Sequence, residues 1–128
     1  MPIEKVFLTR DVAEGLLLIA RNTHPREMLI LLRGRKKKQD LEIDELLLAP
    51  LSEHGEDSSY FRLDLLPLDF TIVGLAHSHP SGSPNPSDED LYHFIGSIML
   101  ILTPPYKTLE DIHAYNTRGG KVKIYLKP

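Results

Sequence analysis

The 128-residue sequence contains no cysteine. Disulfides, thiolate zinc sites, Fe–S clusters and thiol catalysis are therefore excluded, because each needs a cysteine sulfur. No apolar run approaches the ~20 residues that a membrane-spanning helix needs, and the N-terminus lacks the basic-then-apolar pattern of a signal peptide. A formal net charge of −3 argues against a general nucleic-acid-binding protein. These absences predict a cytoplasmic protein in which any metal ligands are histidines and carboxylates.

The length and a hydrophobic content of 41% predict one globular domain over residues 1–128, because a chain of this size can bury a core. We find no internal repeat or linker that would divide it. Helical periodicity predicts a helix that begins at an acidic cap, Asp11 with Glu14 three residues on, and ends near Asn22 and Pro25. The buried face of that helix is expected to contain Val12, Ala13, Leu16, Leu17, Ile19 and Ala20.

Apolar runs and alternating patterns predict strands through the rest of the chain. The strands are expected over 28–32, 41–50, 60–64, 70–77, 98–102, 112–115 and 122–126, with an edge strand or lead-in over 1–8. A polar loop over 52–59, a turn over 65–69 and a second helix from Ser87 to about Gly96 complete the set. This order predicts an α/β (α+β) fold, with a mixed, largely antiparallel sheet and helices packed on it.

A basic cluster of Arg33, Arg35, Lys36, Lys37 and Lys38 follows the first of these strands. Its position between two strands predicts a hairpin tip, and the favoured interpretation is a solvated turn that keeps the sheet edge soluble. A contact for an acidic partner is the alternative.

The central apolar strand ends in two histidines, His77 and His79, and runs on into a loop rich in proline, serine and glycine. Residues two apart on an extended chain point the same way, so the two imidazoles should project side by side. Pro80 favours extended geometry at His79. Ten residues separate His79 from Asp90, which is enough for a loop to bring a carboxylate back to the imidazoles. Two nitrogens and one oxygen, with a fourth position left for water, form the coordination set of a hydrolytic zinc site.

Simpler interpretations exist for the same residues. Ser87 and Asp90 form a Ser-x-x-Asp pattern that approximates a capping box, and taken alone that explanation is favoured. The two interpretations are compatible, because a helix N-terminus also fixes its first-turn side chains. A lone histidine is usually a surface or satisfied core residue, but a pair at the end of a buried strand opens a loop of the kind that carries function.

Hydrolysis also needs a general base, which the spacing does not select. The candidates are Glu27, Glu42, Glu45, Glu53 and Glu89, each by default a solvated surface carboxylate. Glu27 is favoured because it begins a buried strand and could stand beside the end of the central one. The remaining histidines have little support as ligands: His93, which could share a helix face with Asp90, and His24, His54 and His113, which have no supporting context.

Taken together, Glu27, the sequence His77-Ser78-His79-Pro80, ten intervening residues, Asp90 and the preceding Ser87 resemble the JAMM (MPN-plus) metalloprotease signature. The likeness spans most of the chain and is strongest to the small single-domain archaeal members. It implies a curved mixed sheet flanked by helices, similar to the fold of cytidine deaminases.

The resemblance also implies roles for these residues. One Zn²⁺ per chain would be held by His77, His79 and Asp90. Glu27 would bond the zinc-bound water as general base and pass its proton to the leaving amine. Ser87 would help to stabilise the oxyanion.

Catalytic members of this family cleave isopeptide or peptide bonds after the C-terminal Gly-Gly of ubiquitin or ubiquitin-like proteins. In archaea these are the small archaeal modifier proteins (SAMP), which double as sulfur carriers of the ThiS/MoaD-like type. The resemblance therefore implies ubiquitin-like modifiers and their conjugates as partners, and it leaves a homodimer open. The segments 52–59 and 103–110, where larger relatives carry substrate-binding insertions, are short.

Other functions were weighed against this one. A non-catalytic MPN scaffold would only bind partners, but such domains typically lack a ligand or the glutamate, and all five positions are filled here. A peptidase that trims a sulfur-carrier precursor is a further alternative. A zinc deaminase is excluded by the missing cysteine ligands, and a DNA-related role of the RadC type is disfavoured by the acidic charge. Arg118-Gly119-Gly120 mimics a ubiquitin-like tail, but it is internal and predicts a hairpin turn.

Overall fold

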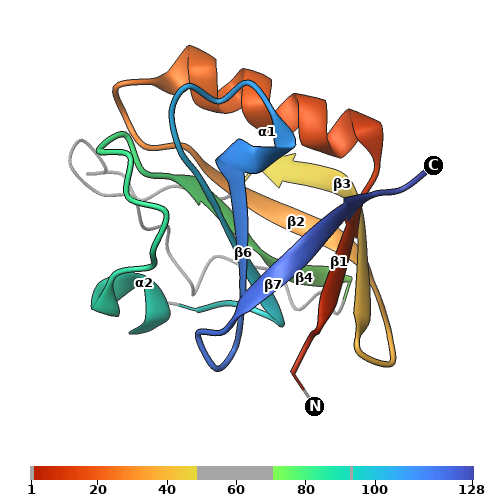
Figure 1. The fold of residues 1–128 in the computed structure, drawn as a ribbon. Helices are drawn as coiled ribbons and strands as arrows, with labels where there is room; N and C mark the ends of the chain where they lie inside the picture. The colour runs from red at the N-terminus through yellow and green to blue at the C-terminus, as the bar shows by residue number, and fades with distance from the viewer. Residues whose placement is uncertain (1, 49–70, 93) are drawn as a thin grey trace.

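The computed structural model describes residues 2–48, 71–92 and 94–128 (Figure 1). In chain order the elements are β1 (Lys5–Leu8), α1 (Arg10–Thr23), β2 (Leu29–Lys37), β3 (Asp40–Leu48), β4 (Ile72–Ser78), α2 (Asp88–Tyr92), β5 (Ile98–Leu102), the 3₁₀ helix η3 (Leu109–Asp111), β6 (Ile112–Asn116) and β7 (Lys121–Leu126). None of the helices described is long and apolar enough to cross a membrane.

The strands of the described residues close into a barrel in the order β1-β3-β2-β4-β5-β6-β7. The pairs β2–β3, β2–β4, β5–β6 and β6–β7 are antiparallel, whereas β1–β3, β1–β7 and β4–β5 are parallel. The predicted α+β class and mixed sheet are confirmed, and the sheet curves until it closes on itself. Helix α1 lies across the barrel, at the top of the view in Figure 1, and the short α2 lies well apart from it.

Strand β1 corrects the expectation of an edge strand. It lies between β3 and β7 and pairs in parallel with both, so that Val6 is opposite Leu41 on one side and Ile124 on the other. Val6 and Leu8 alternate with exposed or half-buried residues and are fully buried in the core. A strand with one apolar face and both edges paired is what closes the barrel.

Helix α1 begins two residues earlier than predicted. Its cap is Thr9, whose Oγ1 accepts a hydrogen bond from the Val12 N–H at 3.2 Å, and Asp11 lies in the first turn. An acidic residue is favourable there because the helix dipole is positive at this end. The predicted apolar face is confirmed, and the helix ends at Thr23. The residues of α1 that enter the core are Val12, Ala13, Leu16, Leu17 and Ala20.

Strand β2 runs past Gly34, where it was expected to stop, and continues to Lys37. The register shifts between Arg33 and Gly34. A Cβ at Gly34 would lie 1.9 Å from the backbone oxygen of Glu42, so glycine is required where the two strands approach this closely.

The basic cluster therefore lies mostly on a strand, and the hairpin turn is confined to its end, where Lys38 has a φ of 59°. Two of its members pair with acids across the hairpin. Arg33 Nη1 lies 3.1 Å from Glu45 Oε1, and Arg35 Nε lies 3.8 Å from Glu42 Oε2. These half-exposed ion pairs agree with a solvated hairpin, and each is worth little in stability.

Helix α2 is five residues long and ends at Tyr92, short of the predicted Gly96. The residues beyond it are used in packing: Phe94 contacts a cluster around Tyr115, and Ile95 contacts one around Leu75. Gly96 then turns the chain with a φ of 71°. Tertiary packing has overridden a helical pattern here.

Some of the remaining predictions are confirmed, and the others concern residues that the structure does not describe. Strand β5 and the β6–β7 hairpin are as predicted, and the Asn116 side chain accepts hydrogen bonds from the Arg118 and Gly120 N–H groups at 3.0 Å, which makes the Arg-Gly-Gly sequence a turn. β4 begins two residues later than expected and ends one later. The predicted loop over 52–59, strand over 60–64 and turn over 65–69 lie outside the described residues, as do 49, 50 and 70.

Candidate metal centre

The candidate site is built on the end of β4, which lies between β2 and β5. His77 and Ser78 are the last residues of this strand, and His79 follows it. The Ser78 N–H donates to the Met28 carbonyl at 3.2 Å, and the His79 N–H donates to the Leu102 carbonyl at 2.8 Å. Both flanking segments therefore hold the backbone that carries the two histidines.

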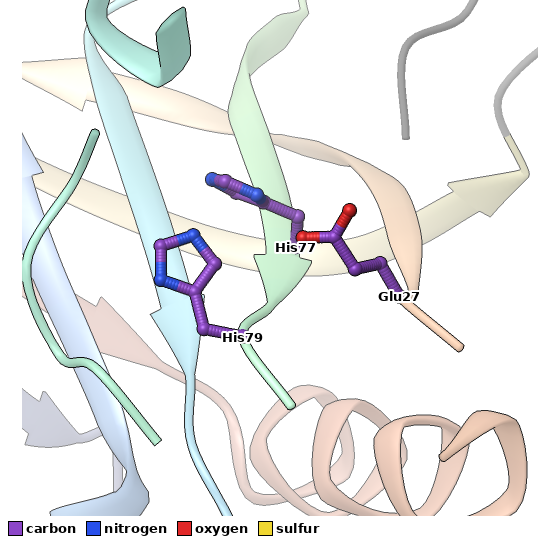
Figure 2. Close-up of side chains that lie close together, drawn as sticks. All are labelled: Glu27, His77 and His79. Atoms are coloured by element: carbon purple, nitrogen blue, oxygen red, sulfur yellow. The ribbon is translucent and has the colours of Figure 1, made fainter. Parts of the chain in front are cut away.

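The two imidazoles lie side by side, as their spacing predicts (Figure 2). The ring centroids of His77 and His79 are 4.9 Å apart, with an angle of 86° between the ring planes. Rings at this angle meet edge to face and do not stack.

Glu27 reaches the same space from the segment just before β2 (Figure 2). Because β2 runs antiparallel to β4, Leu29 pairs with His77 and the start of one strand lies beside the end of the other. One carboxylate oxygen of Glu27 and one ring nitrogen each of His77 and His79 all lie within 4.8 Å of one another. The Glu27 side chain is exposed, whereas His77 is only 3% exposed.

Asp90 contacts both imidazoles from the first turn of α2. Its Oδ2 lies 3.0 Å from His79 Nε2, and its Oδ1 lies 3.7 Å from His77 Nδ1. The residue is 6% exposed. The loop after β4 thus returns a carboxylate to the histidines, as the ten-residue spacing suggested.

Ser87 and Asp90 also form the predicted capping box. The Asp90 N–H donates to Ser87 Oγ at 3.0 Å, and the Ser87 N–H donates to Asp90 Oδ2 at 2.8 Å. The structural interpretation and the site are therefore both present, because the cap is what holds Asp90 against the imidazoles.

Two further contacts fix the loop between His79 and Ser87. His79 Nδ1 lies 3.0 Å from the Ser83 carbonyl oxygen, which can only accept a hydrogen bond, so Nδ1 carries the proton, while Nε2 faces Asp90 Oδ2 across the centre at 3.0 Å. The buried phenol of Tyr115, on β6, donates to the Pro84 carbonyl next to it. Sequence reasoning missed Tyr115, because it lies 31 residues from its partner and no spacing rule connects them.

Burial sets the charge state of the two most enclosed groups. It lowers the pKa of His77 to about 4, against a raising effect of Asp90 and a further lowering by His79. Burial by itself would raise the pKa of Asp90, but the Ser87 hydrogen bonds and the imidazoles together hold that pKa below its ordinary value. At neutral pH His77 is therefore an uncharged imidazole that can coordinate a metal ion through a nitrogen, and it lies beside the ionised carboxylate of Asp90.

These residues fit a zinc ion. His77 Nε2 is buried and has no hydrogen-bond partner among the described residues, whereas the other ring nitrogen, Nδ1, is the one that faces Asp90. Two ligands of a tetrahedral zinc with bonds of ~2.0–2.1 Å lie about 3.3 Å apart, and the two histidine–aspartate separations of 3.0 and 3.7 Å bracket that distance. Imidazole and carboxylate are the donors that remain in a chain without cysteine, and Zn²⁺ accepts both.

The other candidate bases lie elsewhere. Glu42 Oε2 lies 3.2 Å from Lys127 Nζ, and Glu45 pairs with Arg33 on the same sheet. Glu89 is exposed on α2 and does not belong to the group around the imidazoles. Of the described glutamates that were considered, Glu27 is the one brought to the histidines.

The other histidines are likewise apart from the group. His24 Nδ1 lies 3.4 Å from the Tyr106 hydroxyl, and His113 Nε2 lies 3.1 Å from Thr103 Oγ1. Glu53, His54 and His93 lie outside the described residues.

Comparison with known proteins gives the chain a family. Residues 9–117 match the family model of prokaryotic homologs of the JAB domain. A protein of Haloferax volcanii described as a probable metalloprotease is 33% identical over 123 residues, which cover 91% of this chain and 76% of that protein.

Solved structures agree with this match over nearly the whole chain. A JAB1/MPN domain protein from Archaeoglobus fulgidus is 30% identical with a TM-score of 0.71, covering 94% of this chain and 98% of its own. A structure described as a JAMM metalloprotease-like zinc site in the proteasome and signalosome is 27% identical with a TM-score of 0.67, and each chain is covered in full. A protein from Desulfitobacterium hafniense is 26% identical with a TM-score of 0.68, covering 95% of this chain and 92% of its own. On the family match, the related metalloprotease and the shared fold, this chain belongs to the JAB-domain family of JAMM metalloproteases.

Proposed function

We propose that this protein is a zinc-dependent isopeptidase or peptidase that hydrolyses the bond after the C-terminal Gly-Gly of ubiquitin-like modifiers. The observation that carries the proposal is the convergence of Glu27 with His77 and His79, within 4.8 Å of one another, while Asp90 contacts both imidazoles. Membership of the JAMM family supports metal-dependent hydrolysis. The choice of bond rests on the resemblance to family members that cleave after Gly-Gly.

His77, His79 and Asp90 would hold the zinc ion. Bound there, Zn²⁺ supplies a Lewis acid that polarises a carbonyl group and lowers the pKa of a water molecule to about 7. The chain contributes the rest of the arrangement. The Ser83 carbonyl orients His79 through Nδ1, and the Ser87 cap keeps Asp90 in place.

Glu27 is the proposed general base. Its carboxylate is exposed beside the two imidazoles, so it can accept a proton from an attacking water at one oxygen and deliver it to the leaving amine nitrogen. Proton transfer by a positioned side chain is worth roughly 10²–10⁴ in rate.

Ser87 is the proposed oxyanion donor. Its Oγ accepts the Asp90 N–H, and its O–H, which also interacts with the Asp90 carboxylate, would turn to donate to the substrate oxygen on which negative charge develops. The side chain is exposed at the mouth of the loop. One such donor is worth about 10²–10³ in rate.

The substrate class follows from the same proposal. The expected partners are ubiquitin-like modifiers and their conjugates, whose flexible tails can bind in an extended form through backbone hydrogen bonds. The glycines before the cleaved bond have no side chains, so this part of the tail could enter a narrow site. A linear sulfur-carrier precursor presents the same tail, so it belongs to the test.

The experiment compares wild type with Glu27→Gln on ubiquitin-like proteins joined through Gly-Gly either to a lysine side chain or to a linear extension. Wild type loaded with zinc is expected to cleave, and Glu27→Gln to lose at least about 100-fold in rate while keeping its zinc. Glu89→Gln, which changes an exposed carboxylate two residues after Ser87, is the matched control and should retain activity. Full cleavage by Glu27→Gln, or by wild type stripped of metal with a chelator, would contradict the proposed function.

A further inference from the structure

Tyr106 lies beneath the site, in the turn that follows β5. It is 2% exposed, and its φ of 57° lies in the left-handed region that bulky residues rarely adopt. Its backbone is held on both sides: its N–H donates to the Thr103 carbonyl at 3.1 Å, and Arg21, in the last turn of α1, donates from Nη1 to its carbonyl. The structure therefore fixes an unfavourable conformation at this residue by several contacts.

The phenol of Tyr106 contacts residues on both sides of Glu27. Its ring meets the ring of His24 edge to face, with centroids 5.6 Å apart, and its hydroxyl lies 3.4 Å from His24 Nδ1. The Ser78 side chain also acts on the phenol, whose pKa it lowers as a hydrogen-bonding partner would. Ser78 Oγ in turn accepts the Met28 N–H at 2.7 Å within the core.

Glu27 is close enough to act on the phenol electrostatically. Burial raises the pKa of Tyr106, the Ser78 hydrogen bond lowers it, and the Glu27 carboxylate raises it again. The phenol therefore stays protonated at neutral pH, and it keeps a hydrogen to donate within this network.

We propose that Tyr106 is a positioning residue for Glu27. Through His24 on one side, and through Ser78 and Met28 on the other, it fixes the segment that carries the carboxylate to the end of β4. The kinetic part of this inference rests on the proposed function, in which Glu27 is the base. The placement of the segment stands on the contacts alone.

Glu27 needs this support because its side chain is exposed, so burial does not hold it in one place. A misplacement of about 1 Å in a reacting group can cost about 100-fold in rate. Removing one hydroxyl from the network should displace Glu27 by less than about 1 Å. We therefore expect Tyr106→Phe to lower kcat about tenfold, with KM and zinc content unchanged.

The first test does not depend on activity or on metal. Amide hydrogen exchange is measured at Met28 in the metal-free protein for wild type, Tyr106→Phe and Tyr125→Phe. In Tyr106→Phe the Ser78 hydroxyl loses the partner that orients it, so the Met28 amide should exchange at least about tenfold faster, while amides of β5 and β6 keep their wild-type rates. Tyr125 is half-buried on β7, and its ring stacks on that of Phe7 with the centroids 5.3 Å apart. Tyr125→Phe removes a hydroxyl at a different place and is therefore the matched control. An unchanged Met28 amide in Tyr106→Phe overturns the proposal.

The second test is a double-mutant cycle on kcat with saturating zinc, using Tyr106→Phe, Ser78→Ala and the double variant. If the phenol acts partly through Ser78, the loss in the double variant should be clearly smaller than the product of the two single losses. Losses that multiply would show independent roles and would overturn the proposed route. If wild type cleaves no conjugate at all, it is the proposed function that fails, and the Met28 exchange rate still decides the positioning role.

Discussion

His77 and Asp90 meet across the same centre, but the chain holds them by different means. His77 belongs to β4, a strand paired on both sides, and its place follows from the sheet. Asp90 belongs to a five-residue helix after a loop, and its place depends on a few hydrogen bonds around Ser87 and Tyr115. One side of the site is thus set by backbone pairing and the other by side chains.

The difference indicates where this centre is vulnerable. A ladder of backbone hydrogen bonds survives most single substitutions, because no one side chain makes it. The loop side has no such ladder among the described residues, so single side-chain changes there should alter metal affinity with the barrel intact. The predictions below test this contrast.

The largest effect is expected for Asp90→Ala. The change removes the one described carboxylate that contacts both imidazoles, and it leaves the Ser87 N–H without its acceptor. Zinc affinity should fall by more than about 100-fold, because losing a ligand should cost more than losing a group that only orients a ligand. The circular dichroism of the barrel should be unchanged. Competition with a chelating indicator measures the affinity. Wild-type affinity in this variant would mean that the loop side is not part of the metal site.

Ser87 separates the structural role of the loop side from its chemical one. Ser87→Ala should destabilise the protein by about 1 kcal/mol through the lost cap and lower cleavage about 10²–10³-fold through the lost hydroxyl donor. Ser87→Asp restores a good cap without the donor, so it should recover the stability but not the rate. Ser87→Thr keeps both groups and is the matched control. Recovery of rate in Ser87→Asp would reduce Ser87 to a cap.

Tyr115→Phe is the milder test of the same side. Without the phenol hydrogen bond to Pro84 the loop is freer, and Ser83 orients His79 less firmly. Removing a group that orients a metal ligand typically costs 10–100-fold in affinity, and we expect about tenfold here. Isothermal titration with zinc measures it, with Tyr125→Phe as the control. Equal affinities for the two variants would show that the loop holds its shape without this anchor.

The contrast between the two sides also explains how far the sequence predicts the site. The side-by-side histidines follow from the period of a strand, and the place of Asp90 follows from a capping pattern after a loop of adequate length. Both are local rules. The contacts of Tyr106 and Tyr115 join residues about 30 positions apart or more, and no local pattern encodes them.

The fold divides in the same way. The buried face of α1 follows from local periodicity and the β6–β7 hairpin from its turn residues, so both were predicted. The closing of the barrel by β1 depends on parallel pairing with β3 and with β7, which lies near the other end of the chain, and short alternation over 1–8 cannot distinguish that from an edge. Thr9 was missed as a cap because Asp11 offers an equally good capping residue two positions later. Strand β1 ends at Leu8, which decides between them.

The last test separates the two sides by pH in the metal-free protein. Burial lowers the pKa of His77 from 6.5 to about 4. Between pH 6.5 and pH 4 the imidazole is therefore protonated in the unfolded chain and neutral in the folded one. The stability is therefore complete above pH 6.5 and falls as the pH drops toward 4, by on the order of 1–3 kcal/mol. The pKa of Asp90 is held below 3.8, so its contribution is lost only as the pH falls further, through its folded value.

Denaturant unfolding from pH 8 to 3 measures both windows, with His77→Gln as the comparison. Burial also lowers the pKa of His113, so this variant should keep part of the decline between pH 6.5 and 4 and lose the part that belongs to His77. Its decline below pH 3.8 should persist in part, because the Ser87 hydrogen bonds still lower the pKa of Asp90 when the His77 imidazole is gone. If His77→Gln and wild type lose stability in parallel over the upper window, His77 is not buried as a neutral imidazole, and the strand side of the centre is less enclosed than β4 makes it.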